Sequence, residues 1–280
     1  MSGAEWMKAK PDATHAPIDL QTDRPHPARV YDYLLGGKDN FPVDRAAGEA
    51  GLKANPSSRI PPRENRNFLR RVVDHLAAEC GVRQFLDIGT GIPTSPNVHE
   101  VAQAVAPDSR IVYVDNDPIV LAHARALLTS KPEGRTEYVD ADLRDVDRIL
   151  CAPQLREAID LDQPVALLLI AIMHFVGDAD RPYEIVQRLV DALPSGSYLA
   201  LSHLTGDFDA TAWERVAAIY AKQGVTMQVR SHEEISRFFT GLELVEPGLP
   251  IVTKWRPDAD VNASATDTQV AVYGGLARKP

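Results

Sequence analysis

The chain has 280 residues, which suits one large domain or one domain with a substantial appendage. Hydrophobic residues make up 44% and charged residues 25%, an ordinary globular composition that excludes fibrous repeats and long-range disorder. The formal net charge is −9 and uneven: the first 80 residues carry 12 basic and 11 acidic side chains, and the rest carry 18 and 28. This acidic main body argues against a broad nucleic-acid interface.

The cysteines and the hydropathy predict a reduced, cytoplasmic protein. Only Cys80 and Cys151 occur, and their spacing matches no zinc or redox motif. The start of the chain has no apolar signal-peptide core, and the longest nearly unbroken apolar run, 165–173, is far shorter than the ~20 residues of a spanning helix. The eight histidines are scattered without metal-ligand spacing. We therefore expect no membrane partner and no metal site.

The first part of the chain has helical patterns. Residues 1–25 are polar and dotted with proline, and we expect a flexible segment there. Three helices are then predicted, over 27–35, 43–54 and 62–80. Together they form a helical N-terminal section, 26–81, which we interpret as a lid over the remaining domain.

From residue 84 onward, predicted strands alternate with predicted helices. The expected strands are 84–88, 110–115, 137–140, 164–171 and 197–203, followed by two closing strands at about 242–255, with a Pro-Gly turn inside it, and 268–274. Helices are expected at 97–105, 118–128, within 145–159, from an Asp180 cap to 193, at 210–223 and, behind a capping box at Ser231, at 235–239. The alternation predicts an α/β fold over 82–280, a doubly wound, mostly parallel seven-stranded sheet with a closing strand that can run antiparallel.

Ligands of open α/β sheets bind outside the carboxyl ends of the strands, and three strand ends carry suitable residues. Gly89 and Gly91 follow the first strand and allow a tight turn and a close backbone approach. Asp115 ends the second strand, where a carboxylate can accept both hydroxyls of a ribose. Asp142 follows the third strand and can accept the amino group of an adenine. The order and spacing of these residues indicate an adenosine site.

The same loop favours one adenosine cofactor over others. Thr94 stands where a dinucleotide-binding loop has its third glycine, and no phosphate-binding G-x-x-x-x-G-K-[ST] loop occurs. Asp87, two residues before Gly89, would repel phosphates and attract an ammonium or sulfonium group. The residues therefore fit S-adenosylmethionine (SAM). A nicotinamide-dependent oxidoreductase remains an alternative.

The segment Leu86-Asp87-Ile88-Gly89-Thr90-Gly91 resembles motif I of class I SAM-dependent methyltransferases. More specifically, the chain looks like the actinobacterial SAM-dependent methyltransferase family formerly catalogued as a domain of unknown function. The resemblance covers roughly 18–277 and is carried by four segments: ARVYDYLLGGKDNFPVDR (28–45), QFLDIGTGIPT (84–94), VYVDNDP (112–118) and GLELVEPGLPIVTKWRP (241–257).

This resemblance implies a seven-stranded methyltransferase fold with the helical section placed over the cofactor. It implies that SAM is bound by the 87–91 loop including Thr90, by Asp115 with Asn116, and by Asp142 with Leu143. It implies no substrate. The Asn/Asp-Pro-Pro-Tyr motif of amino-directed DNA methyltransferases is absent after the fourth strand, where the sequence is AIMHF, and this argues against DNA bases as acceptors.

Further candidates lie on the helical section. Tyr33, or Tyr31, either packs on the adenine or fills the core. Asn65 shares the apolar arc of the third helix, so it either caps local backbone groups or reaches the amino-acid end of the cofactor. Arg66 belongs to a cluster of five arginines (59, 63, 66, 70 and 71) that forms either a solvated face or an anion site for the cofactor carboxylate.

Methyl transfer needs a general base only when the acceptor carries a proton that must leave. His174, just after the fourth strand, is the first candidate because histidine can titrate near neutrality, and His203 is the second. Either histidine can instead satisfy local hydrogen bonds. The sequence thus predicts a SAM-dependent methyltransferase acting on a small molecule, with a SAM-binding sensor or partner protein without transferase activity as the alternative. The sequence gives no indication of the oligomeric state.

Overall fold

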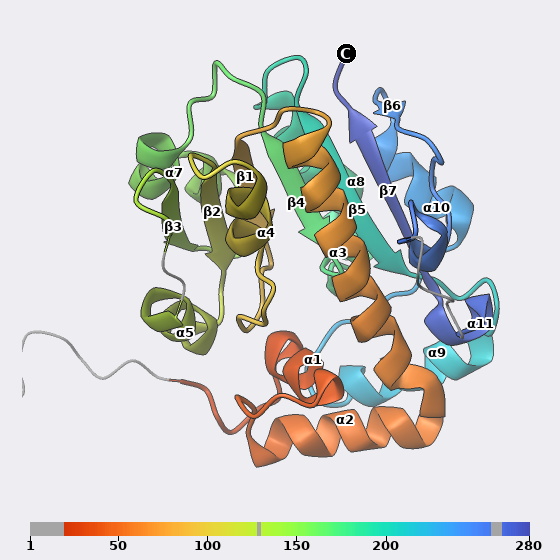
Figure 1. Cartoon of the computed structure of the whole chain (residues 1–280). Coiled ribbons are helices and arrows are strands. Elements are labelled where there is room, and N and C mark those ends of the chain that lie inside the picture. The colour runs from red at the N-terminus through yellow and green to blue at the C-terminus, as the bar shows by residue number, and fades with distance from the viewer. Residues whose placement is uncertain (1–19, 128–129, 259–264) are drawn as a thin grey trace, which may run out of the picture.

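A seven-stranded sheet forms the centre of the computed structural model, which describes residues 20–127, 130–258 and 265–280 (Figure 1). The strand order is β3-β2-β1-β4-β5-β7-β6. Strands β1 to β5 run parallel, and β7 runs antiparallel to β5 and β6. The strands are β1 (Gln84–Ile88), β2 (Arg110–Asp115), β3 (Arg135–Asp140), β4 (Ala166–Ile170), β5 (Tyr198–Leu204), β6 (Glu243–Leu244) and β7 (Val272–Arg278). The predicted doubly wound, mostly parallel sheet is confirmed.

Helices cover both faces of this sheet. They are α1 (Pro27–Leu35), α2 (Pro42–Ala54), α3 (Ile60–Ala78), α4 (Val98–Val105), α5 (Pro118–Leu127), α6 (Val146–Leu150), α7 (Pro153–Ala158), α8 (Pro182–Asp191), α9 (Ala210–Ala221), α10 (His232–Ser236) and α11 (Asp267–Val270). Because helices lie on both faces, β1 is buried throughout and β4 almost throughout, which explains the continuous apolar sequence of β4. No helix in the described part of the chain combines the length and the apolar character that crossing a membrane requires.

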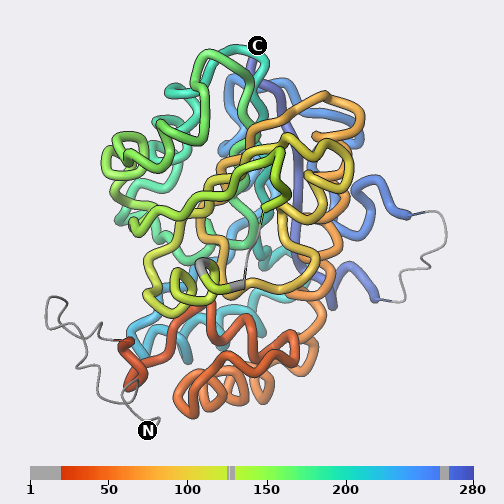
Figure 2. Tube along the Cα trace, turned by 60° about the vertical axis from the view of Figure 1, so that its left-hand side comes forward, coloured from red at the N-terminus to blue at the C-terminus, as the bar shows by residue number. Residues whose placement is uncertain are grey.

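The predicted helical section is present and packs at one end of the sheet. Helix α3 runs along the sheet and buries Phe68, Val72 and Leu76 completely. Helices α1 and α2 lie beyond the carboxyl ends of the parallel strands, and the turned view of Figure 2 keeps them together at that end. The carboxyl ends therefore face a roof of N-terminal helices. Residues 1–19 of the predicted flexible segment lie outside the described residues.

Three local predictions were wrong. Asp180 does not cap α8: the helix begins at Pro182, which suits a first helical position because it needs no N–H there, and the left-handed Arg181 (φ 53°) is the residue before the helix. The strand expected over 242–255 is limited to β6 and a single bridge between Ile251 and Tyr273, since Pro247 and Pro250 lack the N–H that a sheet ladder needs, while the expected turn at Pro247-Gly248 is present. The last strand begins only at Val272, because a capping box at Thr266 forms helix α11 first.

Candidate functional site

A cleft of about 460 Å³ lies at the carboxyl edge of the sheet, beneath the ends of β1 to β4 and against α1 and α3. It occurs at the switch point, where β1 has β2 on one side and β4 on the other. Residues predicted from four separate segments meet there. They are Asn65, Arg66, Asp87, Gly89, Thr90, Gly91, Asp115, Asn116, Asp142 and Leu143.

The loop after β1 needs its two glycines for different reasons. Both have positive φ, 74° at Gly89 and 69° at Gly91. A Cβ on Gly89 would lie 2.5 Å from Ile172 Cγ1, so this glycine also permits close packing against the loop after β4. A Cβ on Gly91 would meet only Ala28 Cβ, at 3.9 Å. The backbone at Gly91 therefore borders open space beneath α1, where a ligand can approach.

The Asp115 carboxylate is held in one orientation by two backbone donors. The N–H of Gly91 donates to Oδ2 and the N–H of Asp117 donates to Oδ1, each at 2.9 Å. Burial raises the pKa of Asp115, while these two donors favour its ionised form. Each carboxylate oxygen can accept more than one hydrogen bond, so Asp115 keeps acceptor capacity for the hydroxyls of a ligand.

Asp87 is a second buried acid of the cleft with a raised pKa. Its side chain is 5% exposed, and burial raises its pKa to about 7, although hydrogen bonding by Thr90 and the charge of Arg66 favour the carboxylate. The neighbouring Asp115 charge raises the pKa further. Two buried acids with one nearby guanidinium form a site that would be stabilised by a cationic group of a ligand.

Asp142 joins the ends of β2 and β3. Asn116 Nδ2 donates to Asp142 Oδ2 at 3.0 Å, and the backbone N–H of Arg144 donates to Oδ1 at 2.8 Å. The Arg144 guanidinium also pairs with Asp142 and, at 3.0 Å, with Asp180. The buried Leu143 side chain adds an apolar wall beside these polar groups.

Asn65 is neither a local cap nor a free group. Its Nδ2 donates to the Tyr31 hydroxyl at 3.0 Å, and its Oδ1 accepts from Ser202 Oγ at 2.5 Å. Tyr31 in turn donates to the Pro62 carbonyl oxygen at 2.9 Å. This network ties α1, α3 and the end of β5 together at the inner wall of the cleft. The contact of Asn65 with a cofactor stays a prediction.

Arg66 supports the loop after β1. Its Nη2 donates to the carbonyl oxygen of Thr94 and, at 2.6 Å, to that of Pro96. The guanidinium also lines the cleft near Asp87. Arg66 is thus a fixed positive group at the end of the cleft where Asp87 lies.

The structure places Tyr33 outside the cleft. Its hydroxyl donates to Glu49, and the guanidinium of Arg59 lies 5.1 Å from its ring centroid. Residues two apart on a helix point ~200° away from each other, so α1 can turn only one of its two tyrosines toward the cleft. That residue is Tyr31, which lines it.

His174 also lies outside this cleft, in an adjoining apolar cavity. It is 3% exposed, and burial together with His203 and Arg230 holds its pKa well below the ordinary value of 6.5. The ring therefore does not titrate near neutrality, which was the reason for considering it as a general base. Its Nδ1 has no hydrogen-bond partner among the residues that the structure describes.

The second histidine, His203, has a structural role. Its Nδ1 lies 2.6 Å from the Leu204 carbonyl oxygen, and its Nε2 lies 2.9 Å from Arg230 Nη1. Arginine only donates, so Nε2 accepts and the proton resides on Nδ1. Burial lowers the pKa of His203 to about 3. Within the described ranges, no group of three or more His, Cys, Asp or Glu side chains could hold a metal ion.

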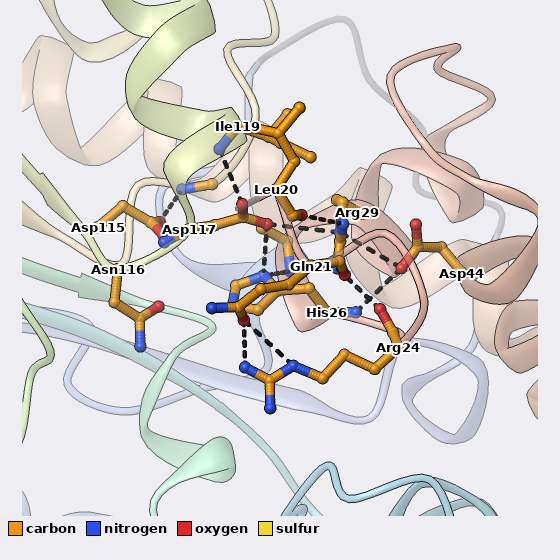
Figure 3. Close-up of polar contacts among 12 residues, drawn as sticks. Leu20, Gln21, Arg24, His26, Arg29, Asp44, Asp115, Asn116, Asp117 and Ile119 are labelled. Carbon is orange, nitrogen blue, oxygen red and sulfur yellow. Dashed lines mark hydrogen bonds and ion pairs between the residues drawn. The ribbon is translucent and has the colours of Figure 1, made fainter. Parts of the chain in front are cut away.

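Sequence reasoning missed a buried ionic clasp above the cleft (Figure 3). Arg29 is 1% exposed, and its Nε lies 3.4 Å from both Asp44 Oδ1 and Asp117 Oδ2. His26 Nδ1 is 3.1 Å from the same Asp117 oxygen. We call Arg29, Asp44, Asp117 and His26 the clasp. Asp117 also donates its backbone N–H to Asp115, so the clasp connects α1 directly to the carboxylate at the end of β2.

The clasp also orders the chain before α1. The Arg29 guanidinium donates to the carbonyl oxygens of Leu20, Gln21 and Arg24, at 3.3, 3.2 and 2.9 Å. Gln21 and Arg24 line the cleft. One sequence signal points to this arrangement: Arg29 stands beside Val30 on the inner side of α1. A charged side chain at such a position needs a buried partner of opposite charge.

The fold and the site together define a class I methyltransferase. The antiparallel β7 lies between β5 and β6, and acidic side chains stand at the ends of three consecutive strands. The chain belongs to the S-adenosyl methyltransferase family, whose family model matches residues 13–280. It is therefore a SAM-dependent methyltransferase, and the family resemblance read from the sequence is confirmed.

Two solved structures resemble the whole chain. A DUF574 family protein from Streptomyces avermitilis MA-4680 is 54% identical with a TM-score of 0.91, over 94% of this chain and 100% of its own. A protein from Thermobifida fusca YX, provisionally assigned as a methyltransferase, is 41% identical with a TM-score of 0.85. The match covers 95% of this chain and 99% of that protein. No curated protein matches the chain.

Proposed function

We propose that this enzyme methylates a small molecule and holds SAM in the cleft at the carboxyl edge of the sheet. The observation that carries the proposal is the pair of buried carboxylates, Asp87 and Asp115, at the ends of two adjacent strands in one cleft. Their chemistry fits a ligand with both hydroxyls and a cationic centre, which SAM has and a diphosphate lacks.

The cleft residues divide by the part of SAM that they would bind. Asp115 would accept the ribose hydroxyls, and Asp142 with Leu143 would hold the adenine, with Asn116 fixing Asp142. At the other end, Asp87 would bind the ammonium group. Arg66 supplies the positive charge for the carboxylate, and Asn65 lies beside it on α3.

When bound, SAM supplies an electrophilic methyl group: the lone pair of the acceptor forms the new bond, and the electrons of the broken carbon–sulfur bond stay on sulfur. The residues of the chain therefore need only to align SAM with the acceptor, and none of them has to form a bond to either molecule. The clasp holds α1 and residues 20–25 over the cleft, which orients the ligands and limits the access of water. The lid role of the helical section is part of this proposal.

The acceptor is proposed to be a small molecule, without nucleic acid or membrane as a partner. The acidic main body supports this, as does the AIMHF sequence after β4 in place of a base-binding motif. The reduced, cytoplasmic setting stays a prediction as well.

Calorimetric titration with SAM, S-adenosylhomocysteine and NADH tests the site. We expect micromolar binding of the first two and none of NADH. Preferential binding of NADH would support the oxidoreductase alternative instead. A protein that binds SAM but forms no S-adenosylhomocysteine with any candidate acceptor would be the sensor that the sequence left open.

A further inference from the structure

A second cavity adjoins the cofactor cleft. Its volume is about 60 Å³, and it lies between α1, α9 and β7. Tyr31, Asn65, Ala171 and Phe175 line both spaces, so the second cavity opens on the inner wall of the cofactor cleft. Most of its lining is apolar, and its main side chains are Val30, Leu34, Trp213, Val216, Tyr220 and Val272.

The lining carries no opposite charge for an ionic ligand. In the part of the chain that the structure describes, no Asp, Glu, Lys or Arg side chain borders this cavity. A charged group that moved into it would lose its hydration without gaining a partner. The cavity therefore selects against carboxylates and ammonium groups.

The polar groups of the cavity include one that lacks a partner. His174 lies between Ala171 and Phe175, which face both spaces, and its buried Nδ1 has no hydrogen-bond partner among the described residues. A buried nitrogen without a partner is costly, and the ring that carries it lines the cavity. Because burial keeps the pKa of His174 low, the ring stays neutral and can share a hydrogen bond with a hydroxyl or amine.

We propose that this cavity binds the methyl acceptor, and that the acceptor is a compact, uncharged, largely apolar molecule whose one hydroxyl or amine lies near His174 and Asn65. This inference rests on the proposed function of the neighbouring cleft. A volume of about 60 Å³ is less than half of the ~150 Å³ of a cavity that encloses a benzene ring, so the cavity takes one end of such a molecule and the rest lies in the adjoining cleft. The acceptor oxygen or nitrogen forms the bond to the methyl carbon, and its proton leaves to water.

In this proposal His174 is a positioning residue. It orients the acceptor by a hydrogen bond and takes up no proton, since a positive ring would lie beside Arg230. Asn65 and Tyr31 support the same end of the acceptor through the network that joins α1 and α3.

A matched pair of probes tests the charge selection. p-Cresol and 4-hydroxybenzoate have nearly the same shape, but only the second is charged at neutral pH. Each is titrated calorimetrically into the full chain saturated with S-adenosylhomocysteine. We expect p-cresol to bind at least tenfold more tightly. Equal binding of the two, or no binding of p-cresol, would overturn the proposal.

A cavity-filling variant tests the location. Val216→Phe extends a side chain into the cavity, and Val105→Phe makes the same change on exposed α4, away from both spaces. Val216→Phe should weaken p-cresol binding at least tenfold and leave S-adenosylhomocysteine binding unchanged, while Val105→Phe should change neither. Retained p-cresol affinity in Val216→Phe contradicts the location.

The binding of p-cresol and the binding of S-adenosylhomocysteine separate this inference from the proposed function. His174→Ala serves as a second variant in case Val216→Phe does not fold. His174→Ala adds no bulk. It should weaken the binding of p-cresol and leave the binding of toluene, a neutral probe without a polar group, unchanged. Equal losses of affinity for both probes would rule out the positioning role. If the wild-type chain binds p-cresol but not S-adenosylhomocysteine, the proposed function fails while the apolar site stands. The reverse result refutes only the acceptor site.

Discussion

The replacement of Asp87 by asparagine isolates the cost of a buried charge. Asparagine keeps the shape of the side chain and removes its ionisation. Burial raises the pKa of Asp87 from 3.8 to about 7, roughly three units, and each unit corresponds to about 1.4 kcal/mol. The ionised carboxylate therefore destabilises the ligand-free fold by about 4 kcal/mol at most.

The sign follows from proton linkage. The pKa of Asp87 is higher in the folded protein than in the unfolded chain, so between pH 3.8 and about 7 the folded state binds more protons. Stability is then lost as the pH rises through this window. From pH 5.5 to pH 8 the loss is about 2 kcal/mol, because about 1.5 units of the window remain above pH 5.5.

Urea unfolding at these two pH values measures the effect. The free energy of unfolding of Asp87→Asn, relative to wild type, should rise by about 2 kcal/mol between pH 5.5 and pH 8. The exposed Asp162→Asn serves as the control and should show no such trend. If the free energy of unfolding of Asp87→Asn differs from that of wild type by the same amount at both pH values, the reasoning is refuted, because Asp87 would then ionise normally in the fold.

The same variant links stability to function. If the Asp87 carboxylate binds the ammonium group of SAM, Asp87→Asn should weaken SAM binding at least tenfold at pH 8. Wild-type affinity should fall by about tenfold for each pH unit below about 7, since protonation removes the charge that the ammonium requires. Unchanged affinity in a more stable Asp87→Asn variant would disprove the assignment of this carboxylate.

Three further changes test other parts of the site. Asp115→Ala should weaken SAM binding by at least ~1–3 kcal/mol in calorimetric titration, the scale of lost charge-assisted hydrogen bonds, and an unchanged dissociation constant would reject the ribose role. Arg29→Met removes the guanidinium that two buried carboxylates share and should cost about 3–5 kcal/mol in urea unfolding, whereas the exposed Arg215→Met should cost little. Tyr31→Phe breaks the network on the inner wall and should weaken SAM binding by about 1 kcal/mol, while Tyr33→Phe should have no effect; the opposite ranking would contradict the placement of the two rings.

Features that depend on near neighbours in the chain were predictable from the sequence. The bounds of β1 and β2 follow from apolar runs that end in Asp-Ile-Gly and Val-Asp-Asn. The capping box at Ser231 starts α10 as expected, because its two hydrogen bonds join residues three apart. The meeting of Gly89, Asp115 and Asp142 in one cleft was equally predictable, since parallel strands bring their carboxyl ends to one edge of the sheet in any such fold.

Features that depend on distant partners were not predictable. Asn65 lies in an apolar arc, yet its partner Ser202 is 137 residues away, so the sequence could not distinguish a local cap from a network across elements. The N-terminal position of Arg29 likewise says nothing of the acid after β2 that it meets. His174 was judged by the ordinary pKa of histidine, whereas burial and its neighbours His203 and Arg230 keep the ring neutral.

The sequence alone therefore determined the parallel part of the sheet, the strand ends that meet in one cleft and the cofactor of the family. Periodicity, turn residues and caps act over a few residues, and parallel topology converts their order into a common edge. Only the tertiary structure decided which tyrosine faces the cleft, what closes it and what lies behind it. Burial and pairing depend on side chains that the fold brings together from far apart, and they set the charge states on which the chemistry of the site depends.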